Sequence, residues 1–172
     1  MTFKKYIARK TQKIRKVILT SRAPDVTAVR KKGKERCKPF LTSVFDNTSR
    51  IKKGDKLLLT MGKDETKRIP YFLEHYRKLG IDHFFFVDND STTPMASQLA
   101  DMDDVSLWHT KDSYSGSHFG VDWMNAINGE HAIGHWTLTV DLDEFLVFPH
   151  MENRTFSELC DYLDNMEVPS LF

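Results

Sequence analysis

The sequence has 172 residues, of which 40% are hydrophobic and 28% charged, so it fits one globular domain rather than a disordered or low-complexity chain. Its formal net charge of +1 hides an asymmetry: residues 1–38 contain 14 Lys/Arg and 2 Asp/Glu, and residues 39–172 contain 11 and 22, which gives +12 and −11. No apolar run approaches the ~20 residues that cross a bilayer, no secretory signal is recognisable, and the two cysteines form no metal or disulfide pattern. We therefore expect a cytoplasmic protein.

Residues 1–55 are basic and irregular, and prolines and glycines interrupt them. They predict an N-terminal arm or lead-in with one short helix around Tyr6 to Leu19. A basic segment of this strength is typical of contact with anionic lipid or nucleic acid. Two interpretations stay open for it: a solvated extension, or peripheral attachment to the inner face of a membrane.

Regular elements begin at Lys56, so we assign the folded part to residues 56–172. Residues 57–61 are apolar and predict a buried strand that ends at Gly62. Apolar residues then recur at helical spacing over residues 69–79, with proline in the first turn and Gly80 just past the end. Residues 83–87 predict a second buried strand, which a polar loop, a short helix near 94–102 and a third strand at 105–109 follow.

After a second polar loop, residues 121–127 predict a helix and residues 136–140 a fourth strand. A short apolar run at 145–148 precedes a last helix, whose start is marked by the capping box of Thr155 and Glu158. Alternating strands and helices predict an α/β fold with a mostly parallel sheet and helices on both faces. In such sheets ligands bind beyond the carboxyl ends of the strands.

Acidic residues follow three of the four predicted strands. They are Asp64 and Glu65, then Asp88 and Asp90, then Asp141, Asp143 and Glu144. Carboxylates gathered at one edge repel each other unless a cation joins them, and a divalent metal with oxygen ligands is the usual solution. An Asp-x-Asp sequence in extended conformation places both carboxylates on one side. The pattern therefore predicts Mg²⁺ or Mn²⁺ bridging Asp141 and Asp143 to a diphosphate.

Five stretches share one order and spacing with a known family: residues 63–84 around KDE and RIPYFLEHYRKLGIDHF, 87–91 (VDNDS), 108–114 with WHT and SY, 119–125 (FGVDWMN), and 140–147 (VDLDEFLV). Together they resemble the family 2-like glycosyltransferases of bacteria, and the resemblance covers about residues 56–165. It implies a GT-A fold, which is Rossmann-like, and a nucleotide sugar, by family precedent a UDP-sugar, as donor substrate. Family members usually carry Asn where Asp64 stands.

The resemblance also assigns roles to individual residues. It implies that Asp64 and Glu65 lie against the nucleoside, that Asp88 holds base or ribose with Asp90 beside it, that Asp141 and Asp143 form the metal-diphosphate pair, and that Gly120 and Asn125 approach the sugar-phosphate. The implied reaction transfers a sugar to a hydroxyl of a glycan or lipid-linked acceptor, as in polysaccharide biosynthesis. Family members continue well beyond the Asp-x-Asp segment. The resemblance therefore implies a C-terminally truncated chain whose catalytic base lies beyond Phe172.

We accordingly expect this chain to bind a nucleotide sugar and leave open whether it transfers the sugar. Two alternatives remain. A haloacid-dehalogenase-type phosphotransferase also uses Asp-x-Asp after a buried strand, with the first aspartate as nucleophile. A non-catalytic protein could instead bind a membrane surface or nucleic acid through its basic arm, although the arm has few aromatic residues for base stacking, so no specific nucleic-acid partner is expected.

Overall fold

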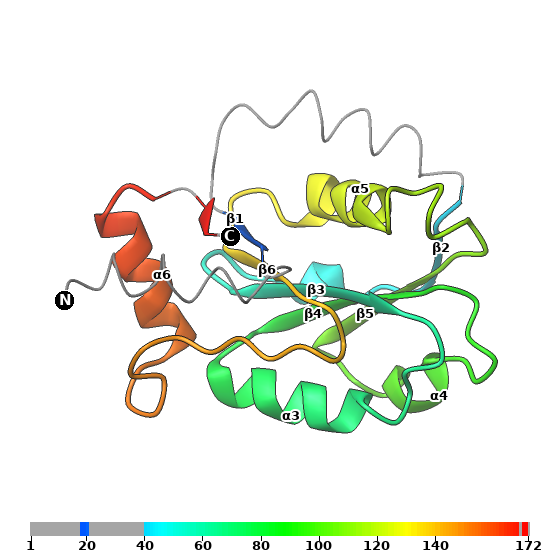
Figure 1. Cartoon of the computed structure of the whole chain (residues 1–172), viewed down its shortest axis with the longest axis horizontal. Helices are drawn as coiled ribbons and strands as arrows, with labels where there is room; N and C mark the ends of the chain where they lie inside the picture. Colours follow the sequence, from blue (N-terminus) through cyan, green and yellow to red (C-terminus); the bar gives the residue numbers. More distant parts are fainter. Residues whose placement is uncertain (1–17, 21–39, 169, 172) are drawn as a thin grey trace.

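The computed structural model describes residues 18–20, 40–168 and 170–171. These residues form an α/β fold around one seven-stranded sheet of order β2-β5-β4-β3-β6-β1-β7 (Figure 1). The strands are β1 (Ile18–Thr20), β2 (Thr42–Phe45), β3 (Leu57–Gly62), β4 (His83–Asp88), β5 (Val105–His109), β6 (Thr137–Thr139) and β7 (Ser170–Leu171). The four central strands β5, β4, β3 and β6 are parallel, whereas β2, β1 and β7 pair antiparallel at the two sides. The predicted α/β class with a parallel sheet is confirmed.

The main helices begin and end where their sequence signals predict. Helix α3 (Ile69–Leu79) buries five residues at helical spacing, accepts a proline in its first turn and ends at Gly80 in the left-handed region, with φ 95°. Helix α6 (Phe156–Asn165) starts with a complete capping box, in which the Thr155 side chain and the Glu158 side chain each accept a backbone N–H. Both helices are therefore set by local sequence.

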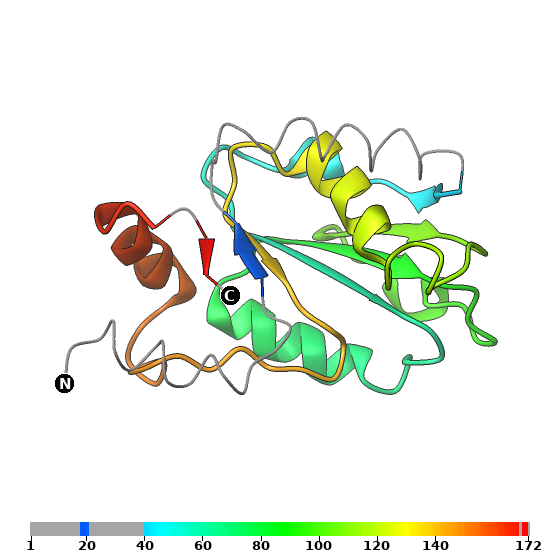
Figure 2. The same cartoon turned by 45° about the horizontal axis from the view of Figure 1, so that its top comes forward.

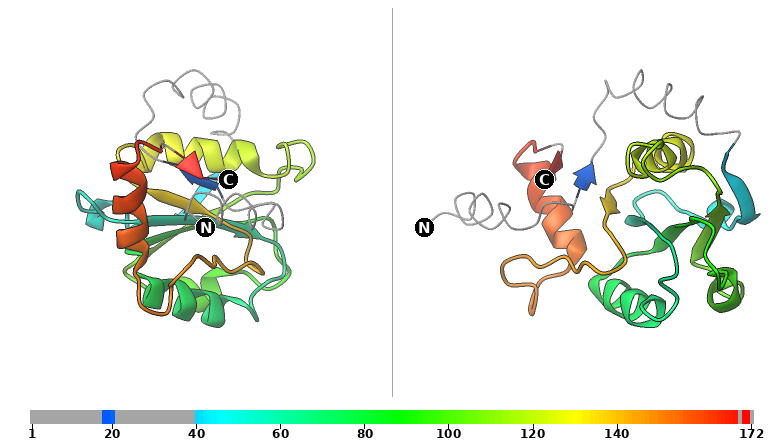
Figure 3. Two further views of the ribbon diagram at one scale, coloured as in Figure 1. Left: turned by 60° about the vertical axis from the view of Figure 1, so that its left-hand side comes forward. Right: turned by 45° about the vertical axis from the view of Figure 1, so that its right-hand side comes forward.

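Helices cover both faces of the sheet (Figures 1 and 2). Helices α3 and α4 (Ala96–Leu99) lie on one face and α5 (Val121–His131) lies on the other. Side chains of β3 alternate between the two layers: Leu58 packs in the core with α3, and Leu57 and Leu59 pack in the core with α5. Helix α6 packs in the same core as α3 and lies on the β6 side of the molecule (Figure 3).

The chain adds the parallel strands to both sides of β3, the first of them in sequence. The chain proceeds from β3 to β4 and β5 on one side, and then crosses over through α5 on the other face to β6, which pairs with β3 on its free side. This is the 3-2-1-4 arrangement of doubly wound sheets, and the order reverses between β3 and β6. The carboxyl ends of β3 and β6 therefore flank the position where such sheets bind ligands.

Part of the predicted lead-in contributes to the sheet. Strands β1 and β2 and the 3₁₀ helix η1 (Thr48–Arg50) all come from residues 1–55. Most of the helix predicted around Tyr6 to Leu19 lies outside the described residues. At its end the prediction is wrong, because Ile18 and Leu19 belong to strand β1, which pairs with β6. The basic residues 1–38 are otherwise outside the described part, so contact with a membrane surface stays a prediction. No helix among the described residues has the length and apolar character to cross a membrane.

Candidate functional site

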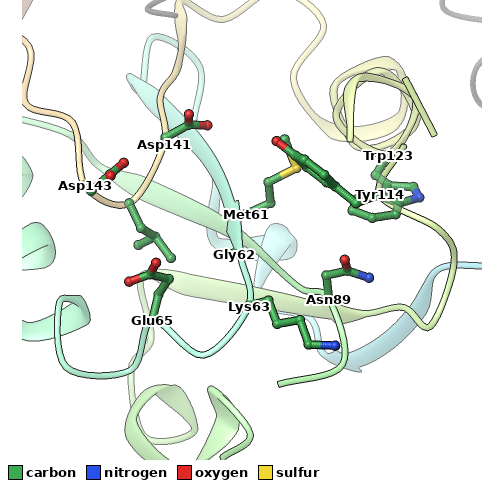
Figure 4. Close-up of a pocket in the computed structure, with 10 residues that line it drawn as sticks. Met61, Gly62, Lys63, Glu65, Asn89, Tyr114, Trp123, Asp141 and Asp143 are labelled. Atoms are coloured by element: carbon green, nitrogen blue, oxygen red, sulfur yellow. The ribbon is translucent and has the colours of Figure 1, made fainter. Parts of the chain in front are cut away.

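A cavity of about 360 Å³ opens at the carboxyl ends of β3, β4 and β6 (Figure 4). It lies where the strand order reverses, which is the position that the doubly wound topology favours for a ligand. The residues that line it come from all three strand ends and from α5 and the loop before it: Met61, Gly62, Lys63, Glu65, Asn89, Tyr114, Trp123, Asp141, Leu142 and Asp143. Three kinds of side chain form separate parts of this lining.

Carboxylates form the first part, where Asp141, Asp143 and Glu65 lie on the same side of the cavity (Figure 4). The Asp141 segment is a turn, since the Glu144 N–H donates to the Asp141 carbonyl oxygen at 3.0 Å. The extended conformation expected for the Asp-x-Asp is therefore wrong. Leu142 is only 3% exposed and packs into the core, so both aspartates still flank a buried anchor and reach the cavity.

Tyr76 of α3 holds the Asp141 turn in place through hydrogen bonds to the backbone after it. Its hydroxyl donates to the Glu144 carbonyl oxygen at 3.1 Å and accepts from the Leu146 N–H at 2.9 Å. Burial raises the pKa of the Tyr76 hydroxyl, so it keeps the proton that this arrangement needs. Neighbouring His75 packs edge-on against Phe145, with ring centroids 4.7 Å apart, and burial lowers the pKa of its imidazole.

A lysine and an amide form the second part, across the cavity from the aspartates (Figure 4). Lys63 follows β3 directly, and its side chain is exposed. Asn89 follows β4, and its Nδ2 donates to the carbonyl oxygens of Thr110 at 3.3 Å and Asp112 at 3.0 Å. Asn89 therefore ties the end of β4 to the loop after β5 while it lines the cavity.

Apolar and aromatic groups form the third part: Met61, Tyr114 and Trp123 (Figure 4). Trp123 is fully buried in α5, and its Nε1–H donates to the Asp112 Oδ2 at 3.2 Å. Met61 lies so close to Gly120 that a Cβ on this glycine would be 2.0 Å from the Met61 Sδ. Gly120, which precedes α5 with φ 77°, therefore sets how closely α5 approaches the cavity.

Three of the predicted site residues meet at the cavity: Glu65, Asp141 and Asp143. The others are not among its lining residues. Asp88 is 3% exposed, and its two oxygens accept the N–H groups of Ser91 and Met95, each at 2.9 Å, so its carboxylate holds the loop after β4.

The remaining predicted residues also lie outside the cavity lining. The Asp64 Oδ1 accepts the Thr92 N–H at 2.7 Å, which fastens the loop after β3 to the loop after β4. The Asp90 Oδ1 lies 3.5 Å from the His109 Nε2. Gly120 contacts the lining residue Met61, and Asn125 is half-buried within α5. The predicted donor residues therefore include several that support the loops around the cavity.

Replacing Gly120 with alanine is expected to destabilise the fold and deform the cavity. Alanine at φ 77° costs about 1 kcal/mol, and forcing the end of the Met61 side chain into another rotamer adds about 0.5–1.5 kcal/mol. Gly134→Ala is the matched control, because Gly134 has φ 88° but no atom within 4 Å of the point that a Cβ would occupy. Urea denaturation of both variants measures the difference. Equal losses in the two variants would show that the Met61 contact has no energetic role.

Lys63, Asn89, Tyr114 and Trp123 line the cavity, and the sequence did not predict this role for any of them. Tyr114 carried a usable signal, because it is the only aromatic residue in the polar loop of residues 111–118. Asn89 carried none, because its amide bonds to backbone carbonyls that the sequence does not reveal.

No protein-family model matches this chain, and no curated protein sequence matches it significantly.

Proposed function

We propose that this chain binds a nucleoside-diphosphate sugar and acts as the donor-binding part of a metal-dependent glycosyltransferase of the GT-A type. The observation that carries the proposal is the position of Asp141 and Asp143, which line a cavity beside β3 and β6 where the strand order reverses. The resemblance of residues 56–165 to family 2-like glycosyltransferases supports the same conclusion.

The distribution of charge in the cavity suits such a ligand. Three carboxylates lie on one side, and Lys63 lies across from them (Figure 4). A diphosphate with a bound divalent cation presents positive and negative charge side by side, so it can satisfy both sides at once.

The donor set fits Mg²⁺ or Mn²⁺ held partly by the ligand. No group of three or more His, Cys, Asp or Glu side chains with metal-binding geometry occurs among the described residues. Mg²⁺ is commonly held by one or two carboxylates and completed by substrate phosphates and water, and Asp141 and Asp143 provide two oxygen donors of that kind. When bound, the cation would neutralise charge on the departing diphosphate.

The side chains of this chain would bind and orient the donor. Lys63 would contact a phosphate as a point charge, and Tyr114, Trp123 and Met61 would exclude water from the opposite side. In the transfer itself, an acceptor hydroxyl oxygen forms a bond to the anomeric carbon, the bond from that carbon to the diphosphate breaks, and the hydroxyl proton passes to a general base. No described residue is assigned as that base. A glycan or lipid-linked acceptor remains part of the proposal.

Calorimetric titration of UDP in the presence of Mn²⁺ tests the donor site. Asp143→Ala should weaken UDP binding at least tenfold, about 1.4 kcal/mol, because it removes a metal ligand from an exposed position without disturbing the core. Asp101→Ala is the matched control, because Asp101 is also exposed and lies in the loop before β5, at the opposite end of the parallel strands. Equal affinity in wild type and Asp143→Ala would contradict the metal assignment.

A further inference from the structure

Two exposed aromatic rings stand beside the cavity on the α5 side. The side chains of Tyr114 and Phe119 are 43% and 65% exposed, and their ring centroids lie 5.7 Å apart in an edge-on arrangement. Tyr114 also packs against Trp123, which is fully buried, with 6.3 Å between the ring centroids. Because Tyr114 also lines the cavity, the two exposed rings extend the aromatic wall of the cavity toward the surface. Exposed apolar groups gathered at a cavity mark an interaction site.

The backbone that presents Phe119 is held in an unfavourable conformation. His118 and Phe119 have φ of 52° and 58°, and Gly120 follows at 77°, so two bulky residues occupy the left-handed region in succession. Such conformations cost free energy and persist where the surroundings enforce them, often at ligand-binding positions.

Buried Ser117 enforces this conformation. Its hydroxyl donates to the Tyr114 carbonyl oxygen at 2.8 Å and accepts the Gly120 N–H at 3.0 Å, and its own N–H donates to the Ser113 carbonyl oxygen at 2.9 Å. The hydroxyl thereby joins Ser117, which precedes the strained pair, to Gly120, which follows it. These hydrogen bonds hold the backbone that carries Tyr114 and Phe119, which lowers the entropy that the loop would lose on binding a ligand.

The chemistry around the rings favours a sugar over other occupants. A pyranose has an apolar C–H face and a polar rim of hydroxyls, so it needs an aromatic surface bordered by hydrogen-bonding groups. The loop before α5 supplies such groups in Asp112 and His118, and the first turn of α5 supplies Asp122, whose Oδ2 lies 2.7 Å from the His118 Nδ1. Two rings are also too small an apolar area for a stable protein interface.

We propose that Tyr114 and Phe119 form a stacking platform for the saccharide acceptor at the mouth of the donor cavity. The proposal rests on the proposed function, in which the diphosphate lies toward Asp141 and Asp143. Tyr114 stands on the other side of the cavity from these carboxylates (Figure 4), and Phe119 packs edge-on against it, so an acceptor sugar stacked there would face the donor rather than overlap it.

Saturation-transfer NMR with simple pyranosides tests the platform. Methyl β-D-glucopyranoside, methyl β-D-galactopyranoside and N-acetylglucosamine would each be offered to the full chain at millimolar concentration, with UDP and Mn²⁺ present. At least one of them should give ring C–H signals with wild type. Tyr114→Ala and Phe119→Ala should each reduce these signals at least fivefold, and Tyr114→Phe, which keeps the ring, should preserve them.

Tyr71→Ala is the matched control, because Tyr71 is a 70% exposed tyrosine on α3, and it should leave the saccharide signals unchanged. UDP affinity, measured in parallel by calorimetry, separates the two proposals. Saccharide signals absent for all three probes, with UDP bound, would overturn the platform and leave the donor site standing. A loss of UDP affinity in Tyr114→Ala without loss of saccharide signals would make the ring a nucleobase contact and overturn the platform. Ring-dependent saccharide signals without any UDP binding would overturn the donor site and support a sugar platform alone.

Discussion

Asp88→Asn is expected to lower the free energy of unfolding by about 1.5–3 kcal/mol, although the substitution changes almost no volume. The Asp88 carboxylate is 3% exposed and accepts two backbone N–H groups, one through each oxygen. Asparagine keeps one oxygen and turns an amide N–H₂ toward the other backbone N–H, so one buried donor loses its acceptor. Urea denaturation followed by circular dichroism measures the loss.

Asp90→Asn provides the control for this substitution. It lies in the same loop, is about half exposed, and adopts φ 56°, a conformation that asparagine tolerates. Its stability should change by less than about 0.5 kcal/mol. If Asp88→Asn instead kept wild-type stability and lost UDP binding, Asp88 would be a donor ligand, as the family resemblance implies, and its structural role would be contradicted.

The regular elements of the parallel sheet could be predicted because each carries a local signal. The buried strands of residues 57–61 and 83–87 are apolar except for Thr60 and His83, and α6 begins at a capping box that satisfies its first backbone N–H groups. Strands β1 and β2 lack such signals: they are short, they pair on the outer sides of the parallel strands, and β2 is mostly exposed. Their position depends on partners distant in sequence, such as Thr42 opposite His109.

The candidate site was predictable only where a side chain's role follows from its place after a strand. Asp141 and Asp143 follow β6 and line the cavity, as that rule predicts. Asp88 follows β4 in the same way, yet its carboxylate turns back to the N–H groups of its own loop. The rule gives the edge of the sheet on which a side chain lies, and it does not give the atoms that the side chain contacts.

Tyr76→Phe is expected to weaken both the fold and the donor site, although it removes a single oxygen. The Tyr76 hydroxyl bonds to the backbone at Glu144 and Leu146, and the Leu146 N–H is buried, so phenylalanine leaves that donor without an acceptor. The loss should be about 1–3 kcal/mol in free energy of unfolding. Because the same hydroxyl holds the end of the Asp141 turn, UDP affinity with Mn²⁺ should also fall, by roughly threefold to tenfold.

Tyr71→Phe separates this effect from the loss of any tyrosine hydroxyl, because Tyr71 lies on the same helix with 70% of its side chain exposed. That variant should keep wild-type stability and wild-type UDP affinity. The two measurements on Tyr76→Phe also distinguish its roles. If stability falls and UDP affinity does not, the hydroxyl supports only the core beneath residue 146. If both fall together, the position of the Asp141 and Asp143 carboxylates depends on a hydrogen bond from α3, and the donor site is built jointly by the strand end and the helix beneath it.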